Sequence, residues 1–404
     1  MSDRVVALTL ADLRTRQSDK WRTHPADVLP AFVAEMDFAL AAPIRDALLE
    51  AVRIGDTGYA NPGGIAEAFA GFAHAIFDWS CDPARVVVVP DVLVGAAEML
   101  RVLTRPGDRI VINTPAYPPF WPIIREYGRE VVEVPLARAG DLWDLDLGRL
   151  EAAFATGAAA YLLCNPHNPT GRVFTRAQLM DIARLAERYG VAVVADEIHA
   201  PMTLPGATHT PFVSLGDAVA ETAVTVTSAS KAFNLPGLKC AIVIAGSETV
   251  RARFAALPDD LHARAGNLGV IASIAAFREG VPWLRDLVAR LDRNRRLLAD
   301  LLRQRLPTVR YEPPEASYLA WLDCSALGLG ADPAAIFLER GRVAVSRGLN
   351  FGTEGAGFVR LNIGTSEELI AEAVDRMARS IADAPVAASH ATAAKRTTSS
   401  SGGR

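Results

Sequence analysis

A short polar run, TSASKAFNLPGLKC at residues 227–240, interrupts an otherwise apolar part of the chain. Lys231 follows Ser228 and Ser230, and a second lysine, Lys239, stands eight positions further on. In a site that disfavours its charged form, a lysine amine is a nucleophile near neutral pH. A purely structural explanation is also open, because serines cap helices and a lysine can occupy a first helical turn. The chemical hypothesis therefore needs partners elsewhere in the chain.

Three other apolar runs also end in polar or aromatic residues: NTPAYPPF at 113–120, CNPHNPTG at 164–171 and ADEIHA at 195–200. Each is a weak signal by itself, because NPTG is also a turn sequence and histidine also packs in protein cores. Their joint order is more specific. Asn168 precedes Asp196 by 28 residues, and Asp196 precedes Lys231 by 35.

Alternating strands and helices would position these groups. From about residue 84, β-rich runs such as RVVVVP, RIVIN and AAAYLLC alternate with helical segments. In TRAQLMDIARLAERYG, Thr175 and Gln178 predict a capping box at the helix start, and Gly190 predicts the helix end. Strands that are apolar on both faces and separated by helices indicate a mostly parallel sheet inside an α/β sandwich. Ligands of such sheets bind at the carboxyl ends of the strands.

A second, smaller α+β pattern follows residue 280, where a long Arg-rich amphipathic helix leads into ASYLAWLD, RVAVS and GFVRLNIG. We expect an N-terminal arm with part of the small domain at 1–44, a large domain at 45–285 and a small domain at 286–383. The last segment, 384–404, lacks apolar periodicity, and we expect it to be disordered.

The composition narrows the class of protein. With 404 residues, 50% of them hydrophobic, the chain can bury a large core. The net charge of −4, without a dense basic run, argues against nucleic acid as the main partner. Four widely spaced cysteines without a C-x-x-C pair argue against zinc knuckles and a disulfide framework. No apolar run approaches membrane-spanning length, so we expect no membrane partner and a cytoplasmic location.

The order of the motifs resembles the fold-type I enzymes that depend on pyridoxal 5′-phosphate (PLP), in their aminotransferase class I/II branch, from about residue 20 to 383. Several stretches look like the PatB/MalY-type cystathionine β-lyase (carbon–sulfur lyase) family: KWRTHPADVLPAFVAEMDF, DTGY, TPAYPPF, LLCNPHNPTG, DEIHAPM, SYLAWLD and GFVRLNIG. The resemblance implies an α/β protein of the PLP-dependent transferase fold type I. Such a fold has a three-layer α/β/α large domain with a mostly parallel sheet, plus a smaller α+β domain.

The resemblance also implies roles for the residues at the strand ends. Lys231 would form a Schiff base with the PLP aldehyde, and Asp196 would keep the ring nitrogen protonated. Asn168 would hydrogen-bond the 3′-oxygen of the ring, and Tyr117 would stack on its face. His199 stands where many aminotransferases carry a tyrosine bonded to the ring oxygen, which agrees with the lyase subgroup and leaves its contact open.

The cofactor phosphate needs donors and positive charge. By resemblance these are Ser228, the backbone N–H groups of Val92 and Leu93 at a helix start, and Tyr59 from a neighbouring subunit. The chain departs from the broad family pattern at Lys239, where aminotransferases usually carry an arginine. A lysine pairs with phosphate as a point charge, with less directional contact than an arginine makes.

The α-carboxylate of the substrate also needs a partner. Arg360 in GFVRLNIG matches the family arginine that clamps this group through two parallel hydrogen bonds. Four further residues, Trp321, Tyr318, Phe38 and Asn350, are either pocket walls or parts of the core.

The favoured hypothesis is α,β-elimination on a sulfur amino acid such as L-cystathionine, giving thiol, pyruvate and ammonia. Lys231 would act as the general base, and the resemblance implies a homodimer with shared sites. The closest alternative is an aminotransferase, and a different class is a PLP-fold protein that only senses or binds a partner. A metal hydrolase built on Asp196, His199 and His209 is weaker, because no third ligand stands at a recognisable spacing.

Overall fold

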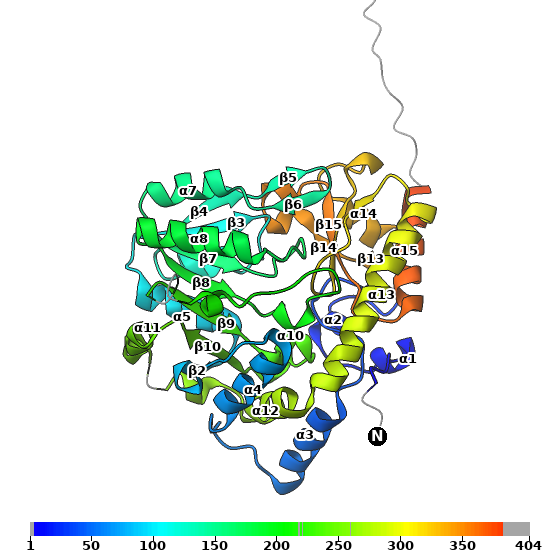
Figure 1. The fold of residues 1–404 in the computed structure, drawn as a ribbon. Helices are drawn as coiled ribbons and strands as arrows, with labels where there is room; N and C mark the ends of the chain where they lie inside the picture. The colour runs from blue at the N-terminus through cyan, green and yellow to red at the C-terminus, as the bar shows by residue number, and fades with distance from the viewer. Residues whose placement is uncertain (1–3, 217–218, 220, 259, 383–404) are drawn as a thin grey trace, which may run out of the picture.

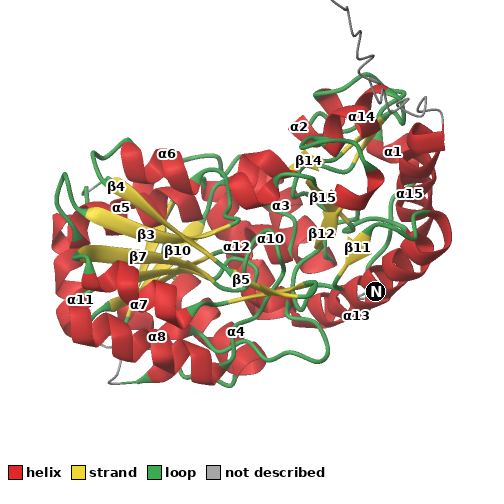
Figure 2. Ribbon diagram, turned by 90° about the horizontal axis from the view of Figure 1, so that it is seen from above, coloured by secondary structure: helices red, strands yellow, loops and turns green. Residues whose placement is uncertain are grey.

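The computed structural model describes residues 4–216, 219, 221–258 and 260–382. The tail predicted at 384–404 lies outside the described residues. The chain forms a large domain around one sheet and a smaller domain beside it (Figure 2).

A seven-stranded sheet forms the centre of the large domain, in the order β2-β10-β9-β8-β7-β3-β4. β10 is antiparallel to both of its neighbours, and the pairs β9·β8, β8·β7, β7·β3 and β3·β4 are parallel. The predicted mostly parallel sheet is therefore confirmed. The strands are β2 (Val86–Val89), β3 (Arg109–Thr114), β4 (Glu130–Pro135), β7 (Ala158–Cys164), β8 (Ala192–Asp196), β9 (Ala223–Thr227) and β10 (Ala241–Ala245).

Helices cover both faces of this sheet (Figure 1, Figure 2). Neighbouring strand residues pack on opposite faces: Val193 belongs to one hydrophobic cluster and Val194 to the other. Because β-strand side chains alternate, this division produces the three layers predicted for the large domain. One face carries α5 (Val92–Leu103) and α6 (Phe120–Arg125); the other carries α4 (Ile65–Phe77), α7 (Leu147–Ala155) and α8 (Arg176–Tyr189).

The α8 helix shows how local sequence determines an element. The side chain of Thr175 accepts the Gln178 N–H and the Gln178 side chain accepts the Thr175 N–H, which completes the predicted capping box. Gly190 ends the helix in the left-handed conformation, with a φ of 67°. Leu179, Ile182 and Ala186 are buried against the sheet, as their helical spacing predicts.

The small domain is built on an antiparallel sheet in the order β11-β12-β15-β14. The N-terminal arm joins it, because β1 (Leu29–Pro30) pairs with β13 (Val343–Ala344). The remaining elements of the small domain are α13 (Val281–Arg305), β11 (Arg310–Tyr311), β12 (Leu319–Asp323), α14 (Pro333–Glu339), β14 (Ser346–Arg347), β15 (Phe358–Asn362) and α15 (Glu367–Ala382). The residue limits predicted above for the domains stay a prediction.

Further helices and strands connect these parts: α1 (Leu10–Leu13), α2 (Asp19–Arg22), α3 (Ala42–Ile54), β5 (Ala137–Ala139), β6 (Leu142–Asp144), α10 (Ala229–Ala232), α11 (Glu248–Ala252) and α12 (Asn267–Glu279). Within the described ranges, every helix is too short or too polar to cross a membrane.

Candidate active site

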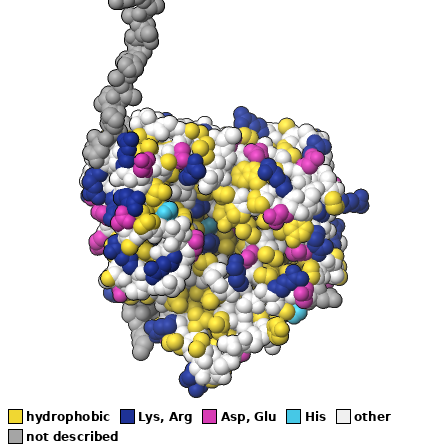
Figure 3. Space-filling view, turned by 180° about the vertical axis from the view of Figure 1, so that it is seen from behind, with side chains coloured by type: hydrophobic (Ala, Val, Ile, Leu, Met, Phe, Trp, Pro, Cys, Tyr) yellow, Lys and Arg dark blue, Asp and Glu magenta, His cyan; other side chains and the backbone are white. Residues whose placement is uncertain are grey.

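A cavity opens at the carboxyl ends of the central strands, where ligands of parallel sheets bind. The face turned away from the viewer in Figure 1 shows a central hollow surrounded by hydrophobic side chains (Figure 3). Eight of the eleven predicted site residues line the cavity: Lys231, Asp196, Asn168, Tyr117, His199, Lys239, Val92 and Leu93. The sequence had placed them on five separate segments, and the sheet topology brings them together.

The register of the strands explains the position of Asp196. Asp196 is the last residue of β8 and lies opposite Cys164, the last residue of β7. On its other side it lies opposite Val226, one residue before the end of β9. Asn168 and Lys231 therefore follow the strands on either side of Asp196. Three adjacent parallel strands thus end at one edge of the sheet and direct their following loops into the cavity.

Lys231 lies in the short helix α10, and its Nζ donates to the carbonyl oxygen of Ala34 in the N-terminal arm at 3.0 Å. Burial, followed by the charge of Arg360, lowers the pKa of Lys231 to about 8. About one tenth of the amine is therefore uncharged at pH 7, far more than for a solvated lysine. The chemical hypothesis requires such a lowered pKa, and the Schiff-base role of Lys231 stays a prediction.

Ser228 has the structural role that was left open above. Its Oγ accepts the N–H of Ser230 at 3.0 Å, which caps α10, and donates to the carbonyl oxygen of Cys240 at 2.6 Å. Ser230 lines the cavity and Ser228 does not. The phosphate contact of Ser228 stays a prediction.

Asp196 is 4% exposed, and its Oδ1 accepts the N–H of Ile198 at 3.1 Å. Burial raises the pKa of Asp196 to about 7, because a carboxylate loses its hydration there, and the charge of Glu197 adds to the effect. Neither Asp196 nor Lys231 forms an ion pair with another described residue. A cationic ring nitrogen would supply the counter-charge that Asp196 lacks.

Arg360 contacts the cavity through Asn168. One of its guanidinium nitrogens donates to Asn168 Oδ1 at 2.9 Å, and the other contacts the Phe32 carbonyl oxygen at 3.2 Å and Ser346 Oγ at 3.3 Å. The guanidinium also lies 4.9 Å from the centre of the Phe351 ring. Its buried Nε has no hydrogen-bond partner among the described residues. Arg360 does not line the cavity itself, and its carboxylate contact stays a prediction.

His199 and Tyr117 form further walls of the cavity. His199 Nδ1 is 3.0 Å from Ser317 Oγ, and burial together with the charges of Lys231 and Arg360 lowers the pKa of His199 to about 3. The imidazole is therefore neutral at physiological pH. Burial raises the pKa of Tyr117, so its phenol also stays protonated, and its ring is in edge-to-face contact with Phe120.

The phosphate end of the cavity is the start of α5. Gly95 allows this helix to approach the sheet closely, because a Cβ there would lie 2.9 Å from a methyl group of Val226. Among the described residues, no acceptor takes the N–H of Val92 or Leu93. Helix N-termini with free N–H groups bind anions. Lys239 lies beside them and pairs with Asp91.

Tyr59 is 91% exposed and does not line the cavity of its own chain. Its predicted contact with the cofactor of a second subunit stays a prediction. Phe38, Tyr318 and Trp321 are buried, which favours the core interpretation for them, and Asn350 is exposed.

Seven residues that line the cavity were not among the predicted site residues: Ala34, Asp91, Cys164, Ile198, Ser230, Pro236 and Cys240. Asp91 had a local signal, because an aspartate before an apolar helix is a typical N-cap. Ala34 acts through its backbone, so no side-chain motif identifies it.

The metal-hydrolase hypothesis finds no support in the described ranges. There, no group of three His, Cys, Asp or Glu side chains could hold a metal ion. His209 Nε2 is 3.3 Å from Glu197 Oε2 and does not line the cavity.

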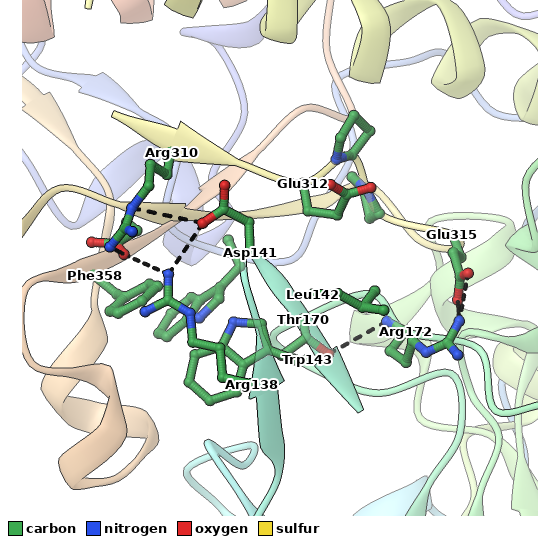
Figure 4. A pocket seen from close by; sticks show the side chains of 14 residues that line it. Arg138, Asp141, Leu142, Trp143, Thr170, Arg172, Arg310, Glu312, Glu315 and Phe358 are labelled. Atoms are coloured by element: carbon green, nitrogen blue, oxygen red, sulfur yellow. Dashed lines mark hydrogen bonds and ion pairs between the residues drawn. The ribbon is translucent and has the colours of Figure 1, made fainter. Parts of the chain in front are cut away.

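A second pocket lies between the β5–β6 hairpin and the small-domain sheet (Figure 4). Asp323 accepts from Arg138 at 2.7 Å and from Arg310 at 2.6 Å. Both arginines also lie near Asp141, at 3.4 and 3.6 Å. Burial alone would raise the pKa of Asp323, but hydrogen bonds from Ser325 and the two arginines lower it to about 2.

The chain matches the family model described as aminotransferase class I and II over residues 37–377. It is 45% identical to the "Putative cystathionine beta-lyase" of Mycobacterium leprae, with 93% of this chain and 97% of that protein covered. It is 35% identical to cystathionine beta-lyase PatB of Bacillus subtilis, with 87% and 92% covered.

The fold is shared with solved structures. A "putative plp-dependent beta-cystathionase" from Corynebacterium diphtheriae has a TM-score of 0.89 at 34% identity, with 94% of this chain and 99% of that chain covered. Cystalysin from Treponema denticola, whose structure contains PLP, has a TM-score of 0.87 at 25% identity, with 95% and 99% covered.

The residues of the cavity fit this cofactor. They provide an amine with a lowered pKa, a buried carboxylate that forms no ion pair among the described residues, an aromatic wall and a helix start whose first N–H groups have no acceptor there. The chain therefore belongs to the aminotransferase class I and II family of PLP-dependent enzymes and, within it, to the group of the cystathionine β-lyases.

Proposed function

We propose that the protein is a PLP-dependent carbon–sulfur β-lyase that performs α,β-elimination on L-cystathionine or a related sulfur amino acid. The products would be a thiol, pyruvate and ammonia. The observation that carries the proposal is that Lys231, Asp196 and Asn168 line one cavity, with Arg360 hydrogen-bonded to Asn168. The names of the relatives in Mycobacterium leprae and Bacillus subtilis support the choice of substrate.

Lys231 has two tasks in this proposal. It would hold the cofactor through the aldehyde carbon and, once displaced by the amine of the substrate, would take the proton from the substrate Cα as general base. The lowered pKa of about 8 suits both tasks, because each needs the uncharged amine. PLP, when bound, supplies the electron sink for the resulting carbanion.

Asp196 and Arg360 have electrostatic tasks. Asp196 would stabilise a positive charge on the ring nitrogen, since it is buried and forms no ion pair with another described residue. Arg360 would orient the substrate α-carboxylate, and its Nε, which has no hydrogen-bond partner among the described residues, supports this role. The neutral side chains of His199 and Tyr117 add no competing charge to the cavity.

The outcome of the reaction depends on the substrate. Once the Cα proton is removed, the sulfur on Cβ can leave as a thiolate and take up a proton, and hydrolysis of the remaining fragment by water gives pyruvate and ammonia. If no leaving group is present, return of the proton at a different carbon gives transamination. An aminotransferase is therefore the alternative function, and it requires a keto-acid acceptor.

One assay separates the two functions. The purified protein is incubated with PLP and L-cystathionine, and pyruvate, free thiol and pyridoxamine phosphate are quantified together. The lyase proposal expects pyruvate and thiol in equal amounts without any keto acid. Turnover only when a keto acid is added, with accumulation of pyridoxamine phosphate, would make the protein an aminotransferase.

Replacement of Lys231 tests the assignment of the covalent residue. We expect Lys231→Ala to lose the visible absorbance of the attached cofactor and to lower the elimination rate at least about 10⁴-fold. Lys239→Ala is the comparison variant, because it also removes an amine from the cavity wall, and at a saturating PLP concentration it should keep the band. Mass spectrometry after borohydride reduction should place the adduct on Lys231. An adduct on another lysine would refute the assignment.

We also propose that the protein is a homodimer with shared sites. Tyr59 and the α3 residues Leu49, Val52 and Ile54 are exposed, at 59% to 91%. Apolar side chains clustered on one helix are typical of an interface. Hydrophobic side chains also extend below the central hollow in Figure 3. An active monomer in sedimentation experiments would contradict this part of the proposal.

A cytoplasmic location is part of the same proposal. All four cysteines are buried and free, which suits a reducing compartment. Fractionation of cells that produce the tagged protein would test it.

A further inference from the structure

The phosphate end of the cavity contains an acidic residue that the proposed role of this cavity does not use. Asp91 immediately precedes α5 and lines the cavity together with Val92, Leu93 and Lys239. A carboxylate at this point is unexpected, because the same region is proposed to bind a phosphate group with two negative charges.

Asp91 has two contacts, one for each carboxylate oxygen. Oδ1 accepts the N–H of Val94 at 2.8 Å and caps the helix. Oδ2 lies 3.1 Å from the Nζ of Lys239. The side chain of Lys239 is 59% exposed and that of Asp91 is 31% exposed, so the pair lies at the mouth of the cavity.

These contacts place a negative charge where an anion would bind. The N–H groups of Val92 and Leu93 have no acceptor within the described residues, while Asp91 already uses the N–H of Val94. Asp91 also engages the one lysine proposed to pair with phosphate. A phosphate on the free N–H groups would therefore meet a like charge and would share its cation.

We propose that Asp91 is a positioning residue that lowers the affinity of this protein for the phosphate group of its cofactor. Asp91 does so by holding Lys239 and by repelling the phosphate. The inference rests on the proposed PLP-dependent function and deepens it. It predicts a gain of affinity when the carboxylate is neutralised. A residue with a purely structural role would not produce such a gain.

Asp91→Asn is the decisive variant, because asparagine caps helices as well as aspartate does and removes only the charge. The full-length protein is freed of cofactor, and the dissociation constants of PLP and of pyridoxal, which lacks the phosphate, are measured by absorbance titration. We expect PLP to bind roughly tenfold more tightly to Asp91→Asn, because like charges a few ångströms apart at a partly exposed site repel by about that factor. Pyridoxal binding should change less than about twofold.

Two further measurements complete the test. Lys239→Gln should weaken PLP binding and leave pyridoxal binding unchanged. Inorganic phosphate should compete with PLP more strongly in Asp91→Asn than in the unmodified protein. Equal or weaker PLP binding by Asp91→Asn, or an equal gain for pyridoxal, would overturn the inference while leaving the proposed function intact. Failure of the unmodified protein to bind either compound would overturn both.

Discussion

Two pockets of this molecule each contain a buried aspartate, and the two aspartates are in opposite states. In the cavity at the strand ends, Lys231 and Asp196 form no ion pair with any described residue. In the pocket beside the β5–β6 hairpin, Asp323 is held by Arg138 and Arg310 at 2.7 and 2.6 Å. Both aspartates are almost completely buried, at 4% and 3% exposure.

The pKa values of the two aspartates show the consequence. Burial raises the pKa of Asp196 to about 7, whereas the hydrogen bonds around Asp323 outweigh burial and lower its pKa to about 2. Removing one partner of a buried ion pair destabilises the fold because the other charge is left unpaired, whereas a buried carboxylate without an ion-pair partner is available for a ligand. The density of charged residues alone would not have distinguished the two pockets.

The same substitution in the two pockets should therefore affect different properties: catalytic activity in one and stability in the other. We expect Asp196→Asn to lower kcat/KM for elimination at least about 100-fold, because the electrostatic support of the ring nitrogen is lost. Asp323→Asn should lower the free energy of unfolding by about 2 kcal/mol, because two arginines lose a charged partner. Steady-state kinetics and urea denaturation of both variants would check these expectations.

Each variant is the control for the other. Asp196→Asn should keep the stability of the cofactor-free protein, since it removes a carboxylate that is costly to bury. Asp323→Asn should keep kcat/KM within about threefold at a temperature where it is folded, because Asp323 does not line the cavity. Loss of activity in Asp323→Asn without loss of stability would show that the two pockets are not separate in function.

The parts of this comparison that were predictable from sequence are local or follow from topology. The capping box of Thr175 and Gln178 is encoded within four residues, and the polar strand ends around Asn168, Asp196 and Lys231 follow from parallel strand order. Parallel strands must place their carboxyl ends at one edge. The position of the cavity was therefore predicted correctly.

The contacts that set the chemistry are long-range and were not predictable. The Ala34 carbonyl oxygen binds Lys231 across 197 positions, and Asp91 binds Lys239 across 148. No local pattern encodes such pairs, because they depend on how the N-terminal arm and α5 pack. The pairing of Arg138 with Asp323, 185 positions apart, was missed for the same reason.

The lowered pKa of Lys231 predicts how the rate of cofactor attachment depends on pH. Attachment of the cofactor needs the free amine, so the attachment rate should rise about tenfold per pH unit below pH 8 and level off above it. A solvated lysine would show a continued rise toward pH 10. Stopped-flow absorbance with cofactor-free protein between pH 6 and 10 would measure the inflection. Arg360→Met should move it upward, because the charge of Arg360 helps to lower the pKa of Lys231.

The smallest expected effect is the contribution of Asp323 to the free energy of unfolding at acidic pH. Its pKa is lowered in the folded protein, so its stabilising contribution is complete above the unfolded-state value near 4 and is lost as the pH falls from there toward 2. We expect this loss to be roughly 1 to 2 kcal/mol after solvent screening of the partly exposed arginines. Urea denaturation at several pH values would reveal it as a smaller pH dependence in Asp323→Asn than in the unmodified protein. An identical pH dependence in both proteins would mean that the arginines do not hold Asp323 as a charged pair, and the contrast between the two pockets would then rest on the cofactor cavity alone.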